Sequence, residues 1–202
     1  MRKRLLGVSL AVGVLLAGAA AGQDKPAEKA APAPMDEKAM MEMMQKLATP
    51  GEAHKKLDPL IGTWDSKVKM WMDPSKPPEE SAGTSENAWV LGNRFVETKA
   101  QGTFMGQPFS GIGYTGYDNV TKKYIGTWMD TAGTSMMVSK GTMAGKVMKA
   151  TSTMPDPATG KMATLTMKTT VNDNDHYTME MWGPGPDGKS YKMMEIDYTR
   201  KK

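Results

Sequence analysis

The stretch "PLIGTWDSKVKM", residues 59–70, marks a change in the composition and side-chain pattern of the chain. The sequence before it is rich in Ala, Pro, Lys and Met, whereas after it the side chains alternate in character between turn residues. The tetrapeptide Ile61 to Trp64 returns at residues 125–128, but the flanking sequences differ and no other self-similarity occurs at that offset. The two copies are therefore not an internal repeat. The first copy predicts where the first strand of the folded domain begins.

From Gly62 to the C-terminus, turn residues separate the alternating segments at roughly ten-residue spacing, a pattern typical of short antiparallel strands. A meander with few or no helices between its strands avoids exposed edges by closing on itself. The sequence therefore predicts an all-β antiparallel meander that closes into a barrel of about ten strands, with a two-sheet sandwich as the alternative. The expected strands lie near residues 63–72, 82–91, 94–104, 108–117, 123–130, 134–140, 146–154, 162–171, 176–182 and 190–200.

The part of the chain that precedes the barrel domain (59–202) divides into three segments. Residues 1–21 combine Arg2-Lys3-Arg4, an apolar run and a small-residue end, which predicts a cleaved secretory signal peptide. The apolar run is shorter than the ~20 residues that a spanning helix needs, so no stable membrane anchor is expected after cleavage. Residues 22–35 predict a disordered linker. The protein is thus expected to be exported, either periplasmic or secreted.

Residues 36–58 predict two short helices. The first, over residues 36–47, has a face rich in methionine. The letters Thr49-Pro50-Gly51-Glu52 resemble a capping box with proline at the first helical position. They predict a second helix from there to about residue 57, before Asp58-Pro59 ends it.

Composition removes several classes of function. The chain has no cysteine, so disulfides, a lipid-modified cysteine and a cysteine nucleophile are absent. The formal charge of +4 includes the basic residues of the signal peptide, and the mature chain carries only about +1, which gives no support for nucleic-acid binding. The segment "GPGPDGKS" at residues 183–190 has the letters of a P-loop, but Pro184 and Pro186 lack the N–H donors that a phosphate cradle needs.

A catalytic function rests on four candidate acid and base groups: Asp118, Tyr124, Asp130 and His176. The chain has two histidines. The other one, His54, lies in the helical leader, so a three-histidine zinc site is excluded. No serine lies in a nucleophile-elbow context. An enzyme of unknown reaction is therefore the alternative to a binding protein.

Methionine is unusually frequent, at 21 of 202 residues. Thioethers are soft ligands suited to Cu(I), so exported copper binding is a further alternative, and haem held by His176 is a variant of it. Methionine can equally replace Leu and Ile as a flexible filler. Adjacent residues of a strand point to opposite faces, which spoils most chelating pairs, so no resident cofactor or metal is expected. The methionines cluster at positions 40, 41, 43 and 44 and in the pairs 70/72, 136/137, 179/181 and 193/194.

The aromatic residues favour a binding function. All five tryptophans fall on expected strands, where large aromatics either fill a barrel or line its cavity. A barrel of about eight or more strands is wide enough to hold one small ligand. We therefore expect a small, largely apolar or amphipathic molecule as the partner. The expected lining is Trp71, Trp89, Tyr114, Tyr124 and Trp128, with Arg94, Asp130 and His176 as orienting polar groups.

These residues also carry a resemblance to a known family. Residues 49–78, the block "LGNRFVETKAQGTFMGQPFSGIGYTGYDNVTKKYIGTWMDT" at residues 91–131 and the closing "MEIDYTR" resemble the DUF1579 family of unknown function. The family is similar to lipocalin-like (calycin) barrels, and many members are exported. Its activity is not established, so the resemblance implies a fold but no catalytic residues.

The likeness to lipocalins implies a role for the first IGTW copy. Barrels of that type begin their first strand with G-x-W, here Gly62-Thr63-Trp64, and a basic residue of the last strand packs on the indole. Arg200 ends the expected last strand. The resemblance therefore implies that Trp64 and Arg200 join the first strand to the last, while Trp128 of the second copy faces the pocket.

Overall fold

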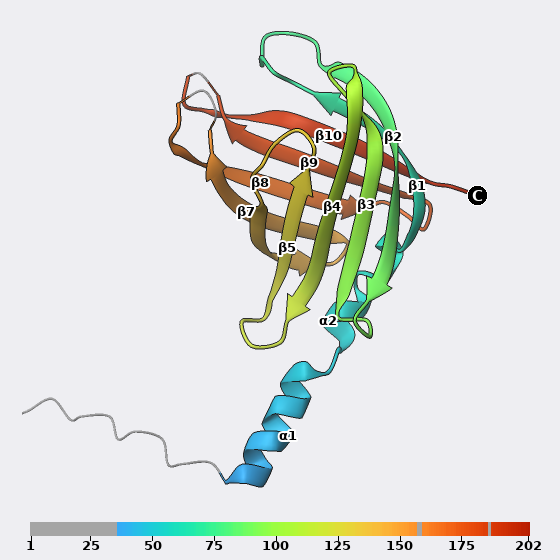
Figure 1. Ribbon diagram of the computed structural model, residues 1–202, viewed down its shortest axis with the longest axis vertical. Coiled ribbons are helices and arrows are strands. Elements are labelled where there is room, and N and C mark those ends of the chain that lie inside the picture. Colours follow the sequence, from blue (N-terminus) through green and yellow to red (C-terminus); the bar gives the residue numbers. More distant parts are fainter. Residues whose placement is uncertain (1–35, 157–158, 186) are drawn as a thin grey trace, which may run out of the picture. The chain divides into compact units, whose positions relative to one another are not determined.

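The computed structural model describes residues 36–156, 159–185 and 187–202 (Figure 1). The predicted signal peptide and linker lie outside the described residues. The residues from Glu37 to Lys202 form one compact unit. This unit begins with α1 (Glu37–Ala48), α2 (Glu52–Lys55) and the 3-10 helix η1 (Asp58–Leu60). No helix in the described part of the chain combines the length and the apolar character that a membrane crossing requires.

Ten antiparallel strands follow and close into a barrel. Each strand pairs with its neighbours in the sequence, and β1 also pairs with β10, so the barrel has no free edge. The predicted all-β barrel is confirmed, and the sandwich alternative is wrong. The strands are β1 (Gly62–Met70), β2 (Glu79–Val90), β3 (Phe95–Phe104), β4 (Gln107–Asp118), β5 (Lys123–Asp130), β6 (Met137–Ala144), β7 (Val147–Pro155), β8 (Met162–Val171), β9 (His176–Pro184) and β10 (Ser190–Arg200).

Two local predictions differ from the structure. The strand expected over residues 134–140 corresponds to β6, which begins at Met137 and ends at Ala144. Gly141 does not terminate this strand. Gly141 lies where β7 approaches closely, and a Cβ there would overlap the Lys149 carbonyl and Ala150. The expected capping box is also absent: the N-cap of α2 is Gly51, whose N–H donates to His54 Nδ1 at 3.1 Å.

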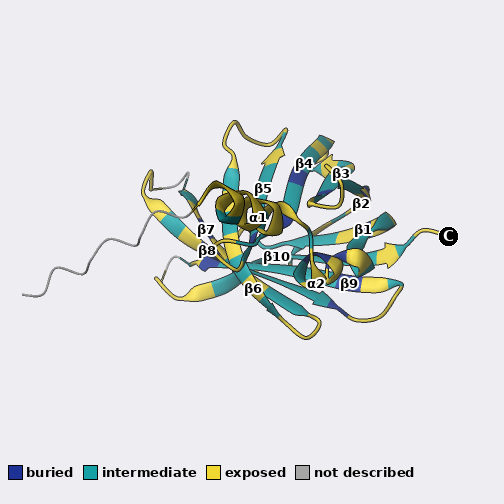
Figure 2. Ribbon diagram, turned by 90° about the horizontal axis from the view of Figure 1, so that it is seen from below, coloured by how far each residue is buried: buried dark blue, intermediate teal, exposed yellow. Residues whose placement is uncertain are grey.

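α2 and η1 form a floor at one end of the barrel (Figure 1). Leu57, between the two helices, is fully buried and packs with Val96 and Tyr124 from the barrel wall. Side chains of the strands also bind backbone carbonyls of the floor. Tyr124 Oη donates to Ala53 O at 2.7 Å, and Trp64 Nε1 donates to Leu60 O at 2.9 Å. Figure 2 looks at this end of the molecule and shows buried positions on the strands, whereas α1 has no buried residue.

Arg200 connects the floor to both ends of the strand order. It is the register partner of Trp64, and its Cζ lies 4.1 Å from the centroid of the Trp64 ring. The guanidinium donates from Nη1 to Ile61 O at 2.7 Å and from Nη2 to Pro59 O at 3.1 Å. The planar guanidinium of Arg200 thus makes both a cation–π contact and charge-assisted hydrogen bonds. The stack that the resemblance implied is present in the structure.

Gly62 is required at its position for two reasons. Its φ of 131° is a conformation that residues with a side chain rarely adopt. A Cβ at this residue would also overlap Arg200 Nη1. The G-x-W motif therefore consists of a glycine that admits the guanidinium and a tryptophan on which the guanidinium packs.

Replacing Arg200 by Met should lower the free energy of unfolding by about 2–4 kcal/mol, because the floor carbonyls lose charged donors and Trp64 loses its cation. Arg94→Met is the matched control, since the Arg94 guanidinium is exposed and bonds only carbonyls of its own turn. The control should cost less than about 1 kcal/mol. Urea denaturation of both variants measures the difference, and equal effects would contradict a special role for Arg200.

His54 gives the floor a pH dependence. Its side chain is 5% exposed and packs edge-on against Tyr117 at 5.7 Å. Burial lowers the pKa of His54 from its ordinary value of 6.5, and the positive charge of Arg94 acts in the same direction. The unfolded chain therefore binds the proton of His54 more readily than the folded chain does. As a result, the contribution of His54 to the free energy of unfolding is complete above pH 6.5 and is lost as the pH falls through that value.

The free energy of unfolding should therefore decrease between about pH 7.5 and pH 5.5, above the range in which carboxylates titrate. His54→Gln should be less stable at pH 7.5 and should show a flatter profile across this window. His176→Gln, on the exposed outside of the barrel, is the control and should retain the loss of stability. Chemical denaturation at a series of pH values measures all three profiles, and an unchanged slope in His54→Gln would refute the assignment.

Candidate binding site in the barrel interior

Strand register divides the inward-facing residues into two walls. Successive residues of a strand point to opposite faces, and the buried Trp64, Val96 and Tyr177 fix which face is inward. In the middle of β2–β5 the inward residues are mostly small, with Trp128 as the large aromatic among them: Ser85, Asn87, Thr98, Ala100, Gly111, Gly113, Thr115, Gly126 and Trp128. On β6–β10 and the end of β1 methionine dominates: Met70, Met137, Met143, Met148, Met154, Met167, Met179, Met181 and Met194.

Inward side chains above the floor are partly open to solvent. Met167, Met181 and Trp128 point inward from strands that are paired on both sides, yet each is only half-buried. A barrel filled with side chains would bury residues in the middle of its wall completely. At the floor, by contrast, Leu57 and Trp64 are 0% exposed. Solvent therefore enters from the opposite end, the mouth, at the β3–β4 and β9–β10 turns.

Trp128 is the most defined feature of the small-residue wall. Its six-membered ring lies against Gly111 and Gly113 of β4, where a Cβ on either glycine would overlap ring atoms. Its Nε1 donates to Asp130 Oδ2 at 2.7 Å. One face of the indole is thus covered by glycine backbone and its edge is fixed by a carboxylate. The surface that Trp128 keeps exposed belongs to the side that faces the interior.

Asp130 is the one acidic residue of β5, and it lies at the mouth end of the small-residue wall. Besides Trp128, it accepts the Ala132 N–H through Oδ1 at 3.0 Å. A carboxylate has about four acceptor positions, so Asp130 can accept further hydrogen bonds. Its position is suited to a hydroxyl or amine donor of a bound molecule.

Asn87 Oδ1 and Ser152 Oγ are among the buried polar side-chain atoms that have no hydrogen-bond partner among the described residues. Both residues face inward, and they are 5% and 4% exposed. The amide nitrogen of Asn87, in contrast, donates to Leu60 O at 2.8 Å. Buried polar atoms normally bind protein, water or ligand. These two atoms are unpaired polar positions in the barrel wall, and less than 1 Å² of each is accessible.

Titratable groups of the interior also include tyrosines near the floor. Tyr177 stacks on Tyr198 with ring centroids 4.1 Å apart and contacts Trp64 edge-on. Burial raises the pKa of Tyr177 to about 12, and it raises the pKa of Tyr198 well above its usual value. Both hydroxyls therefore stay neutral and serve packing rather than proton transfer.

The four acid and base candidates do not come together. Asp118 accepts hydrogen bonds from Val120 and Thr121 in its own turn. Tyr124 lies at the floor, six residues or about 20 Å along β5 from Asp130. His176 is exposed outside the barrel, where its Nδ1 lies 2.9 Å from Asp173 Oδ1. Among the residues that the structure describes, no three His, Cys, Asp or Glu side chains converge in a way that could hold a metal.

The expected lining residues occupy four different places. Trp128 lines the interior, whereas Tyr124 and Trp89 belong to the floor, Trp89 Nε1 donating to Asp58 Oδ1 at 2.9 Å. Trp71 follows β1 at the mouth, and its N–H donates to Met193 O. The fifth residue, Tyr114, differs from expectation because it lies on the outer face, where its hydroxyl donates to Glu97 Oε1 at 2.8 Å.

Two of the expected orienting groups also lie outside. Arg94 sits in the β2–β3 turn and donates to Leu91 O at 3.0 Å. His176 begins β9 on the outward face. Of the expected orienting residues, Asp130 alone faces the interior. Alternation along a single strand could not reveal which of these residues face inward, because a shift of the register by one residue exchanges the two faces of the strand.

A separate depression of about 620 Å³ lies on the β2–β4 side. The outward side chains Thr84, Gln101 and Ser110 and the glycines Gly83 and Gly102 contribute to its lining. It is open to solvent and contains no titratable side chain. It therefore offers less to a ligand than the barrel interior.

Comparison with known proteins agrees with this fold. The family described as "Protein of unknown function (DUF1579)" matches residues 49–200. The chain belongs to this family. The DUF1579 resemblance is thereby confirmed, and no curated protein matches the sequence.

Solved structures similar to this DUF1579 protein include the following two. The crystal structure of Rv2717c from M. tuberculosis has a TM-score of 0.55 and 19% identity, covering 76% of this chain and 100% of that one. A redesigned beta barrel, mFAP1, bound to DFHBI, has a TM-score of 0.39 and 16% identity, covering 74% of this chain and 100% of that one. At such identities the likeness concerns the fold alone.

The glycine cradle can be tested directly. Gly111→Ala should displace the Trp128 ring and lower the free energy of unfolding by about 1–3 kcal/mol, because the added methyl overlaps the indole. Gly133→Ala is the control, since the nearest atom to a Cβ there is 4.0 Å away. Near-ultraviolet circular dichroism and thermal denaturation report ring position and stability. If both variants behave alike, Trp128 does not lie in the cradle.

Proposed function

We propose that this DUF1579 protein is a binding protein whose barrel interior takes up a small, largely apolar molecule with a flat ring system and a polar group. The observation that carries this proposal is the half-buried Trp128 inside a closed barrel. An indole with one face on glycine and one face toward the interior is a stacking surface. Burial of aromatic surface against it would supply binding energy.

The two walls fit such a molecule in different ways. The small-residue wall leaves room for a rigid ring, because Trp128 lies flat on Gly111 and Gly113, and Gly126 projects no side chain into the interior. The methionines of the facing strands are unbranched and polarizable, so they adapt to the outline of an apolar ligand. A flat molecule between these walls would contact a rigid surface on one side and a deformable one on the other.

Polar contacts would orient the bound molecule. Asp130 could accept a hydrogen bond from a hydroxyl or amine, because only Trp128 Nε1 and the Ala132 N–H donate to it among the described residues. Few polar groups in a mainly apolar pocket are typical of small-molecule sites. The absence of a paired acid and base among the described interior residues favours binding over the catalytic alternative.

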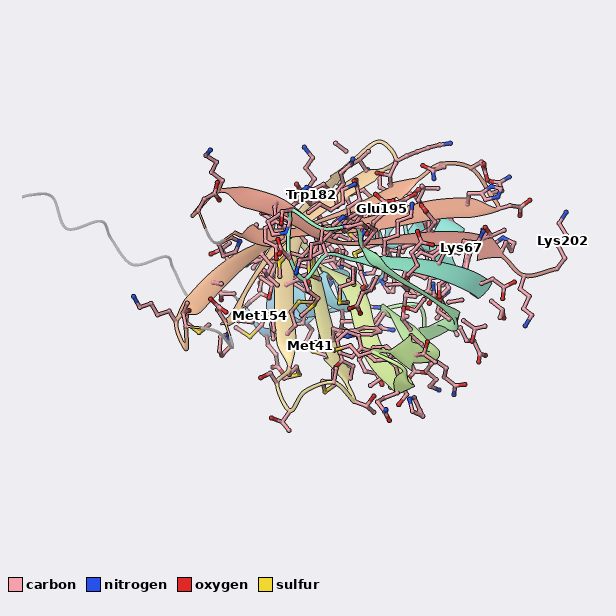
Figure 3. All side chains as sticks on the ribbon, turned by 90° about the horizontal axis from the view of Figure 1, so that it is seen from above. Met41, Lys67, Met154, Trp182, Glu195 and Lys202 are labelled. Carbon is pink, nitrogen blue, oxygen red and sulfur yellow. The ribbon has the colours of Figure 1, made fainter. Side chains whose placement is uncertain are left out.

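Nile red, a flat neutral apolar dye, provides a probe. Wild-type protein should bind it saturably, and Trp128→Ala should raise the dissociation constant about tenfold, since loss of stacking and area costs about 1.4 kcal/mol. Trp182→Ala is the matched control, because Trp182 lies on the outer face beneath Lys192. Figure 3 labels Trp182 near Glu195 on the β9–β10 side of the barrel.

Fluorescence titration of the three proteins measures the dissociation constants, and native mass spectrometry detects any molecule that copurifies. The control should bind Nile red as wild type does. Lack of saturable binding by wild type, together with an empty protein in native mass spectrometry, would refute the proposal. Equal loss in both variants would show that the dye binds elsewhere.

A further inference from the structure

The register of four consecutive strands places methionines side by side on the inner surface. Met70 of β1 pairs with Met194 of β10, Met194 pairs with Met181 of β9, and Met181 pairs with Met167 of β8. We call Met70, Met194, Met181 and Met167 the methionine row. Met70 is far from the other three in the sequence, so barrel closure and strand register together assemble the row.

The spacing within the row allows several sulfur atoms to meet. Directly opposed residues of antiparallel strands have Cβ atoms about 4.5–5.5 Å apart. The Sδ atom lies two bonds beyond Cβ on a side chain with three rotatable bonds. Neighbouring thioethers can therefore turn toward one point in the interior without any movement of the backbone.

A β-bulge adds one more methionine to this region. The register of β10 against β9 shifts between Lys192 and Met194, so Met193 also reaches the inner face. Its sulfur lies against Gly183, where a Cβ would overlap it. The bulge and Gly183 together place a fifth thioether beside the row.

The outer face of the same strands carries a second row, one residue away. Lys69, Glu195, Glu180 and Lys168 are successive register partners, and we call them the ion-pair row. Lys69 and Glu195 lie 3.3 Å apart, and Lys168 and Glu180 lie 2.8 Å apart. Lys192 binds both glutamates and relieves their mutual repulsion, and its hydrogen bond holds the pKa of Glu195 below the usual value. Opposite charges across strands stabilise their pairing, so the ion-pair row supports the register of the methionine row.

We propose that the methionine row is a binding site for a soft monovalent cation, Cu(I) or Ag(I). Thioether sulfur selects such ions, whereas Zn²⁺, Mg²⁺ and Ca²⁺ require the nitrogen or oxygen ligands that the row lacks. All members of the row are half-buried, so an ion entering the interior can reach them. The basic groups of these strands, Lys69, Lys168 and Lys192, point outward and are paired with carboxylates, so they do not repel a cation in the interior.

This inference is independent of the apolar ligand and needs only an interior that solvent can enter. It also differs from a general affinity of methionine for soft metals. Met41 and Met44 of α1 are 64% and 61% exposed, but they lie on one helix without cross-strand neighbours. They provide a control with the same number of thioethers outside the barrel.

The test compares Met181→Leu/Met194→Leu with Met41→Leu/Met44→Leu. Leucine keeps nearly the same volume, so both variants should fold. Silver nitrate is titrated into the full mature protein by calorimetry in a chloride-free buffer, and Cu(I) is titrated without oxygen against a chromophoric chelator. Wild type and the α1 variant should bind one equivalent, whereas the row variant should bind at least tenfold more weakly.

Methyl NMR of protein labelled at the methionine methyl carbons adds a second readout. The resonances of Met70, Met167, Met181 and Met194 should shift on addition of Ag(I), while those of α1 should not. The proposal is overturned if wild type binds no Ag(I), if the α1 variant loses binding, or if both variants bind as wild type does.

Nile red separates this proposal from the proposed function. A row variant that still binds Nile red but has lost Ag(I) supports both. Nile red binding by wild type without any Ag(I) binding overturns the metal site and leaves the apolar site intact. Ag(I) binding at the methionine row without saturable Nile red binding overturns the apolar site and leaves the metal site intact.

Discussion

The packing of the Arg200 guanidinium on Trp64 is the contact on which the rest of the structure depends. It joins the first residues of β1 to the last residue of β10, and it also donates to Ile61 O and Pro59 O of the floor. A single planar cation therefore closes the barrel laterally and fixes the floor across its end. Gly62 is part of the same contact, because only a residue without a side chain leaves space for Nη1.

Closure at one end explains why the other end can stay open to solvent. Aromatic residues, Trp64, Tyr177 and Tyr198 among them, gather near the floor and provide the dense core that a stable domain needs. With stability supplied there, the middle of the barrel can carry glycine, serine and half-buried methionine instead of a packed core. Absent side chains at Gly111 and Gly113 cost packing energy, but the Trp128 ring recovers much of it by lying across both. The site is thus made from positions that the core does not require.

The sequence could predict features that depend on local pattern and on one motif. Strand alternation and turn spacing predicted the barrel, and the G-x-W motif with a terminal arginine predicted the Trp64–Arg200 stack. The face of each strand residue was harder to predict, because alternation alone leaves two choices. Tyr114 and His176 were expected inside and lie outside, where charged neighbours bind them. Trp89 faces inward but serves the floor, since Asp58 lies within hydrogen-bond distance of its indole. Such assignments require the register between strands that are distant in the sequence.

The methionines show the same dependence on register most clearly. Along one strand, Met193 and Met194 are adjacent and would point to opposite faces in a regular strand, yet the bulge at this position turns both inward. Met70 and Met194 are far apart in the sequence but are direct partners, because Arg200 opposite Trp64 sets the alignment of β1 with β10. The ion-pair row lies one residue away on the outer face and opposes any slip, since a shift of one residue would bring lysines and glutamates inside. A soft-ligand surface inside this barrel is therefore a consequence of the same closure contact that stabilises its floor.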